Sequence, residues 1–251
     1  PPPPPHNNTG LYSSAASDVY KRQVMQFVVN HTTFDPDNEL DSALLKSLKP
    51  LGVEPGKAFD PDNVAEIDGA ALREAAERFA SESLAKMGDA EFLAANLTKT
   101  FQPKGEISVE LLAIQSVIGP IGQPAQEALY PPVNTIDGKP MNAMHDYEIV
   151  MAPEAMPPAK AFWSVTLYDT DNGFFIPNER KKYSVGENAG FKLDEDGGIR
   201  IVIAAEQPEG VPEENWLPIE RRDVDLNVIM RIYNPDLVKY KHWTPPKAKK
   251  L

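Results

Sequence analysis

Hydrophobic residues follow two different spacings along the chain, and the first spacing is helical. Between positions 24 and 130, apolar residues recur about every 3.6 positions, which predicts amphipathic helices. One helix is expected over residues 41–52, with Asp41 as its N-cap, and a longer one over residues 60–88. The longer helix should bury one stripe of side chains, namely Leu72, Ala76, Phe79, Ser83 and Met87. A last helix should bury Ile107, Leu111, Ile114 and Val117.

From Val133 onward apolar and polar residues alternate, which predicts strands with one buried face. Five segments show the alternation, namely residues 145–151, 162–168, 173–176, 199–204 and 226–232. In the second of these, Trp163 belongs to the face expected in the core. The Asp-Gly pair at 196–197 predicts a hairpin. Short strands without helix-length gaps between them favour an antiparallel sandwich or barrel.

Two terminal stretches are predicted to lie outside the fold. Residues 1–5 are all proline, and residues 11–23 look like translated sequencing-adaptor sequence from metagenomic reading frames. We therefore set residues 1–23 aside as a disordered, adaptor-like segment. Near the other end, a basic tail is expected to be a solvated linker, and its lysines are Lys239, Lys241, Lys247, Lys249 and Lys250.

The composition excludes several classes of function. The chain has 37 acidic and 25 basic residues, a formal charge of -12, which is the wrong sign for binding nucleic acid. It has no cysteine, so thiolate nucleophiles and cysteine-ligated metals are excluded. No window approaches the roughly 18 uninterrupted apolar residues of a membrane span, so the chain should be soluble. No cofactor-binding motif is found, so no cofactor is expected.

A series of motifs in the second half resembles one bacterial family. The motifs, in order, are residues 163–169, Asn178, residues 183–186, 196–197, 215–218, 231–233 and 243–246. Their order and spacing are similar to those of the family called domain of unknown function 1214. Two positions depart from the family pattern, since relatives often have arginine at Lys182 and a Tyr-Ile-Gln run at 202–204. If these positions contact a ligand in relatives, the specificity of this chain has changed.

The resemblance refines the predicted fold to α+β, with a small helical segment followed by an antiparallel jelly-roll-like β-sandwich. The domains are then expected at residues 1–23 for the adaptor-like segment, 24–130 for the helical part and 131–251 for the β domain. In relatives a domain of unknown function 1254 comes first. Its amino-terminal β domain is absent here, which implies a truncated chain and leaves the compartment open, with export or a periplasmic location among the options.

Candidate catalytic residues are few. No Gly-x-Ser-x-Gly motif is present, and His145 is the only histidine near the family motifs, where it could be a general base or a structural residue. Asp169 and Asp171 could form a turn, contact a cation or supply catalytic carboxylates. A calcium loop is excluded because Arg180 stands where such a loop needs glutamate, and no spacing predicts a metal site.

A binding role is the leading hypothesis. Aromatic and polar residues at strand ends and in loops could either close the end of a sandwich or hold a polar ligand such as a carbohydrate. The predicted ligand-binding set is Tyr168, Asp169, Asn178, Arg180, Tyr183, Asn215 and Trp216. Tyr233 belongs to the same aromatic group. The alternative is a hydrolase-type enzyme that uses Asp169 or His145 and needs the upstream domain to complete its site.

Overall fold

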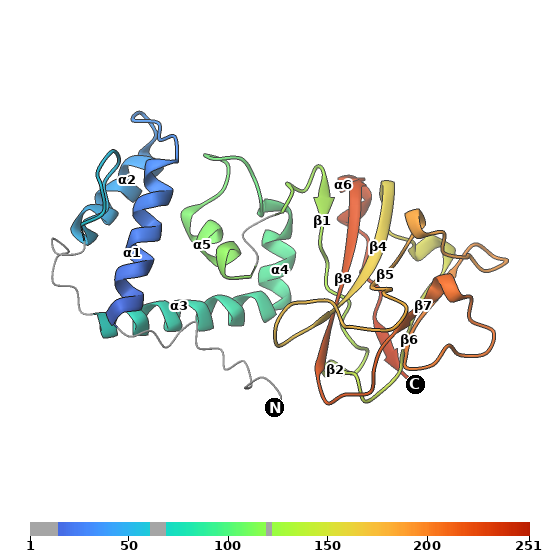
Figure 1. Cartoon of the computed structure of the whole chain (residues 1–251). Helices are drawn as coiled ribbons and strands as arrows, with labels where there is room; N and C mark the ends of the chain where they lie inside the picture. Colours follow the sequence, from blue (N-terminus) through green and yellow to red (C-terminus); the bar gives the residue numbers. More distant parts are fainter. Residues whose placement is uncertain (1–14, 61–68, 119–121) are drawn as a thin grey trace, which may run out of the picture. The chain divides into compact units, whose positions relative to one another are not determined.

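The chain forms two compact units, one helical and one rich in strands (Figure 1). A computed structural model describes residues 15–60, 69–118 and 122–251. Residues 15–60, 69–93 and 108–118 make up the helical unit, and residues 94–107 and 122–251 make up the β unit. Residues 94–107 and 122–130, which the sequence groups with the helices, therefore lie in the β unit.

The helical unit contains α1 (Ala15–Asn30), α2 (Glu39–Leu48), α3 (Gly69–Gly88), α5 (Val109–Ile118) and the first residues of α4 (Ala90–Asn96). Helix α1 includes residues 15–23, which were predicted to be disordered, while residues 1–14 lie outside the described residues. Side chains of α1 contact the loop after α2, since Gln26 Nε2 donates to the Glu54 carbonyl at 2.7 Å.

The N-cap of α2 is Asn38, so the prediction of Asp41 is wrong. Asn38 has an extended backbone, and its side-chain oxygen accepts from the amides of Leu40 and Asp41. Asp41 lies in the first turn, where its carboxylate accepts from the Asp35 amide at 2.7 Å. The helix is followed by a 3-10 turn (Lys49–Leu51) and ends at Gly52, whose φ of 74° is left-handed.

The stripe predicted on the longer helix is only partly buried. Ser83 is buried, but Leu72 is 46% exposed and Phe79 is 38% exposed. Helix α3 packs against α5, where Leu111 and Ile114 are buried as predicted. A helix buries only the side chains that another element covers, and the sequence spacing does not reveal which neighbours exist. The predicted start at Asp60-Pro61 adjoins residues 61–68, which lie outside the described residues.

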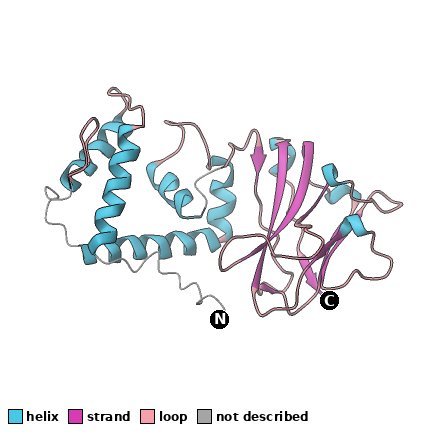
Figure 2. Ribbon diagram, in the orientation of Figure 1, coloured by secondary structure: helices cyan, strands magenta, loops and turns pink. Residues whose placement is uncertain are grey.

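The β unit contains two sheets and is confirmed as the strand-rich half of an α+β chain (Figure 2). The first sheet has the order β1-β8-β4-β5, and β2 also pairs with β8. Its strands are β1 (Ala128–Leu129), β2 (Met141–Asn142), β4 (Ala159–Asp169), β5 (Ser184–Gly186) and β8 (Asp225–Pro235). The second sheet has the order β7-β6-β3-β9. Its strands are β3 (Tyr147–Met151), β6 (Ile199–Ala204), β7 (Trp216–Pro218) and β9 (Ala248–Lys250).

The two sheets bury one shared hydrophobic core, as the alternation predicts. Trp163 and Val165 on β4 and Met230 on β8 join Ile149 on β3 and Ile201 on β6 in that core. Pairing between the named strands is antiparallel, as predicted, except for β6 and β7, which are parallel and were not expected. Neither sheet is closed into a barrel. A short helix, α6 (Leu237–Tyr240), follows β8.

Three segments differ from their predictions. Residues 173–176 form no strand and contribute only a single bridge between Phe175 and Tyr168. Residues 194–198 form a turn in which Gly197 has a φ of 88°, but no strand directly precedes it, so it does not close a hairpin. The end of the predicted lysine-rich linker is strand β9, because Ala248 packs into the core and the strand pairs with β3.

Candidate functional site

A pocket of about 680 Å³ lies on the face of the first sheet that points away from the core. On β4, Trp163, Val165 and Leu167 are buried in the core, so the alternate residues point to the opposite face. Strand β8 brings Arg231 beside them, since Arg231 pairs with Ser164 in the ladder. We call this pocket the outer pocket, and it is lined by Ser164, Thr166, Tyr168, Phe175, Lys181, Lys182, Tyr183, Ser184, Ala189, Arg231 and Tyr233.

Three stacked rings form one wall of the outer pocket. The ring of Phe175 lies between those of Tyr168 and Tyr183, with centroid distances of 5.3 Å and 4.8 Å and an angle of 9° between Phe175 and Tyr183. Phe175 is 48% exposed, so this ring remains accessible to solvent. Tyr233 stacks on Phe162 at 4.4 Å. Stacking fixes the orientation of these rings and leaves a flat apolar surface.

Arg231 is held in place by Tyr168. Its Nη2 donates to the Tyr168 hydroxyl at 2.6 Å, and its guanidinium lies 5.4 Å from the centre of the Tyr168 ring. Arg231 is half-buried and forms no ion pair with any residue that the structure describes. Arg231 therefore offers a fixed guanidinium with unused N–H donors.

Three hydroxyl groups line the outer pocket together with this guanidinium. Ser164 pairs with Arg231 in the β4–β8 ladder, and Thr166 pairs with Ser184 in the β4–β5 ladder. The side chains of Ser164, Thr166 and Ser184 all line the outer pocket, and none of the three hydroxyls has a hydrogen-bond partner among the described residues. Polar groups that have no internal partner are available to a ligand or to water.

The loop that carries Lys181 and Lys182 is fixed by Asn178. The Asn178 amide donates to the carbonyls of Ile176 and Lys182 at 3.2 Å and 2.8 Å, and its oxygen accepts from the Lys182 amide. The ammonium of Lys182 donates to the Glu213 carbonyl. Burial lowers the pKa of Lys182 because it removes the charged ammonium from water, although the Glu213 carboxylate acts in the opposite direction.

The structure separates the seven residues of the predicted binding set. Tyr168 and Tyr183 line the outer pocket. Asp169 instead builds the turn after β4, where its carboxylate accepts from the Asp171 amide at 2.8 Å and from Asn172 Nδ2 at 3.0 Å. These contacts support the turn role that the sequence also allows for Asp169. Its binding role stays a prediction.

Asn178, a further member of the set, fixes the loop beside the outer pocket and is not among its lining residues, and the last three members lie around the start of β7. Asn215 is buried and joins distant backbone segments, since it accepts from the Lys192 amide and donates to two carbonyls. The indole of Trp216 is also buried and donates to the Ala204 carbonyl at 2.9 Å. Arg180 lies over the Trp216 ring at 4.9 Å and pairs with Glu213. None of these three residues lines the outer pocket.

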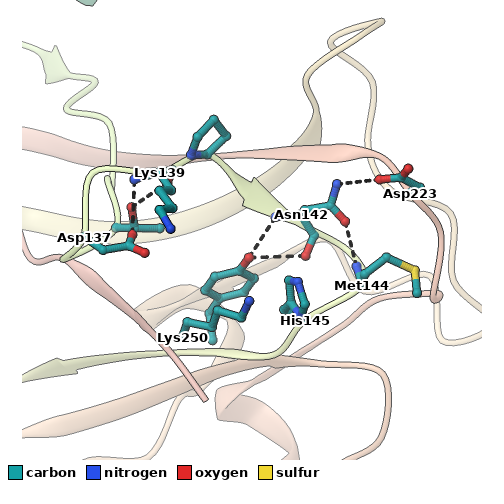
Figure 3. Close-up of a pocket in the computed structure, with 10 residues that line it drawn as sticks. Asp137, Lys139, Asn142, Met144, His145, Asp223 and Lys250 are labelled. Atoms are coloured by element: carbon teal, nitrogen blue, oxygen red, sulfur yellow. Dashed lines mark hydrogen bonds between the residues drawn. The ribbon is translucent and has the colours of Figure 1, made fainter.

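His145 lines a second pocket, of about 490 Å³, near the end of β2 (Figure 3). The imidazole makes no hydrogen bond to a described residue, and the neighbouring Asp146 carboxylate pairs with Arg221 at 2.6 Å. Asp169 is not among the residues of this pocket. Figure 3 shows Asn142 bonded to Asp223 and to the Met144 amide, so these polar groups are satisfied internally.

The described residues lack two features that would indicate a function. They contain no group of three or more His, Asp or Glu side chains that could hold a metal ion. None of their helices has both the length and the apolar character needed to cross a bilayer.

The sequence signal for the outer pocket was incomplete. Phe175 was assigned to a strand, and Arg231 was noted only within a family motif. The available signal was the position of Arg231 in β8, where it alternates with the core residues Met230 and Ile232 and so must point to the outer face.

The fold and the pocket define a two-sheet β domain with an aromatic and cationic outer face. The model of the family described as "Protein of unknown function (DUF1214)" matches residues 127–237, which include every residue of the outer pocket. This match supports the resemblance of the β unit to that family. It does not address the pairing with a domain of unknown function 1254 or the truncation, and both stay predictions.

Two solved structures are similar to this chain. The VPA0106 protein from Vibrio parahaemolyticus is 25% identical with a TM-score of 0.53, and the match covers 88% of this chain and 57% of that one. An uncharacterized protein from Burkholderia cenocepacia is 13% identical with a TM-score of 0.38, over 97% of this chain and 50% of that one. The matches thus cover only 57% and 50% of the length of these two structures. Among curated proteins, none matches the sequence.

Proposed function

We propose that the β unit is a binding module that holds a polar ligand of the carbohydrate class in the outer pocket. The observation that carries this proposal is the stack of Tyr168, Phe175 and Tyr183, in which Phe175 is exposed, in one pocket with hydroxyl groups that have no partner among the described residues. A sugar ring offers apolar C–H faces and polar edges. The stacked rings suit the faces, and the hydroxyls suit the edges.

The position of the rings favours ligand contact over closure of the sandwich. A ring that closes the end of a sandwich is covered by the core, whereas Tyr168, Phe175 and Tyr183 are absent from the hydrophobic core cluster of the described residues. Their pocket also has a volume in the range of small-molecule sites. A jelly-roll-like domain that binds sugars would fit this arrangement, by analogy at the level of the fold.

A glycan array with the purified chain tests the proposal, and Phe175→Ala is the informative variant. Truncation removes the middle ring of the stack, so we expect affinity for the bound glycan to fall roughly 2- to 12-fold, the equivalent of about 0.5–1.5 kcal/mol. Phe174→Ala is the matched control, because Phe174 is 73% exposed and does not line the outer pocket.

Two results would contradict the proposal. The first is an array on which the wild-type chain binds no glycan. The second is an equal loss of affinity in Phe174→Ala and Phe175→Ala, which would separate binding from the outer pocket.

The hydrolase alternative gains no specific support. The Asp169 carboxylate is engaged in its turn, and His145 lines a different pocket from the outer pocket. That alternative stays a prediction.

A further inference from the structure

We propose that the ligand of the outer pocket carries a carboxylate, so that the module selects acidic sugars of the uronate type over neutral sugars. This inference rests on the proposed function, because it names the chemistry of the ligand that the same pocket would hold. It depends on the charges of the pocket, whereas the proposed function depends on the stacked rings.

The first observation is the unpaired state of Arg231. The β unit has four other arginines, and each pairs with a carboxylate: Arg180 with Glu213, Arg200 with Glu148, Arg221 with Asp146 and Arg222 with Glu220. Arg231 is half-buried and pairs with no carboxylate of the described residues. A guanidinium that is partly removed from water without an anionic partner is costly, and an anionic ligand would remove that cost.

The second observation is the sign of the charges around the pocket. The chain has a formal charge of -12, yet the outer pocket is lined by Lys181, Lys182 and Arg231 and by no acidic residue. Lys182 has Glu213 and Glu214 in its surroundings, so its charge is partly offset. Lys181 is exposed and takes part in no ion pair with a described residue. The pocket is therefore a local positive site on an acidic protein, and it favours anions.

The geometry of Arg231 suits a carboxylate. One donor of Nη2 is used by the Tyr168 hydroxyl, and the Tyr168 ring supports the guanidinium. The remaining N–H groups can form the two parallel hydrogen bonds that a planar carboxylate accepts. Most lining residues lie on β4, β5, β8 and the loop before β5, and the pocket includes no α-helix N-terminus of the kind that commonly binds phosphate.

The test is isothermal titration of the full chain with two probes, tetragalacturonate and its fully methyl-esterified form. The probes share their sugar rings and differ in charge. We expect the acid to bind roughly 10- to 150-fold more tightly at low salt, as expected for hydrogen bonds to a charged group, and the preference to shrink at high salt. Arg231→Gln should reduce the affinity for the acid far more than the affinity for the ester and so abolish most of the preference.

Arg200→Gln is the matched control, because it removes a guanidinium from a half-buried position on the second sheet and changes the net charge equally. It should retain the preference for the acid. Lys181→Gln is a second variant, since Lys181 is exposed and its change should leave the fold intact while lowering the preference about two- to threefold. Circular dichroism checks that each variant is folded.

The outcomes separate this inference from the proposed function. Equal affinity for the acid and the ester, or a preference that survives Arg231→Gln in a folded protein, would overturn the carboxylate assignment and leave sugar binding in place. Binding of neutral array glycans together with no binding of tetragalacturonate would have the same meaning. If no glycan binds at all, both proposals fail.

Discussion

Replacement of Asn215 tests whether this residue stabilises the fold or contacts a ligand. The sequence placed Asn215 in the predicted ligand-binding set. Its side chain is 1% exposed and makes three hydrogen bonds: it accepts from the Lys192 amide at 2.8 Å and donates to the Lys192 and Arg200 carbonyls at 2.8 Å and 3.0 Å. In Asn215→Ala one amide and two carbonyls lose this partner. At about 1–3 kcal/mol for each unsatisfied group, with partial relief by water, we expect a loss of about 3–5 kcal/mol in unfolding free energy.

Urea unfolding followed by tryptophan fluorescence measures this loss. The three tryptophans are Trp163, Trp216 and Trp243, and all lie in the β unit, so the signal reports the unit that contains Asn215. Asn227→Ala is the control. Asn227 is exposed on β8 and its side chain has no hydrogen-bond partner among the described residues, so its change should stay within about 0.5 kcal/mol.

The reasoning would be refuted by a specific pair of results. If Asn215→Ala costs less than about 1 kcal/mol and instead abolishes glycan binding, then Asn215 contacts the ligand as the sequence suggested. A loss of several kcal/mol together with unchanged affinity in the folded fraction supports the structural role.

Two further predictions concern the acid stability of the second sheet and the packing of the first. A hydrogen bond from Arg200 lowers the pKa of Glu148 below its ordinary value of 4.5. The ionised carboxylate therefore stabilises the folded chain above about pH 4.5, and this stabilisation is lost as the pH falls through the lowered pKa. Glu148→Gln should reduce the difference in unfolding free energy between pH 7 and pH 3, measured by urea unfolding. Gly186→Ala would place a methyl carbon 2.8 Å from Ser164 Cβ and should cost about 1–3 kcal/mol in the same assay, with partial recovery by Ser164→Gly.

Each of these predictions has its own opposing result. For the carboxylate, Glu154→Gln serves as the control because Glu154 is exposed and forms no ion pair with a described residue. The same change in pH dependence for both variants would contradict a role of the Arg200 contact. For the glycine, wild-type stability in Gly186→Ala would show that β4 and β5 can separate slightly without cost.

The positions of β3, β4, β6 and β8 were predictable from the sequence because these strands show local alternation, whereas the short strands β1, β2, β5, β7 and β9 were not predicted. Trp163 and its alternate neighbours had to share a face, and the structure places them in the core. The parallel pair β6–β7 was not predictable, because alternation is the same in parallel and antiparallel strands. Burial on α3 was overestimated for a related reason, since spacing shows which face is apolar and not whether another element covers it.

The candidate site was predictable only in part. Tyr168 and Tyr183 were found because amphipathic rings at strand ends and in loops can stack on a ligand. The pocket also includes Arg231, and the sequence does not show that Arg231 forms no ion pair with a described residue. Asn215 was placed in the binding set because the sequence cannot show that its hydrogen bonds reach the backbone of Lys192, 23 positions away. Hydrogen bonds between a polar side chain and residues far away in the sequence can be seen only in the folded structure.

Strand β9 has a consequence for how molecules of this protein behave at high concentration. It pairs with β3 on one side, and on the other side its Ala248 is bridged by Thr135, so little of its backbone is free to recruit another strand. Of its two exposed residues, Lys249 pairs with Glu148 at 3.2 Å, and Lys250 forms no ion pair with a described residue. A covered border that carries a lysine charge is a poor template for another strand, so the second sheet should resist growth into intermolecular ribbons at this edge.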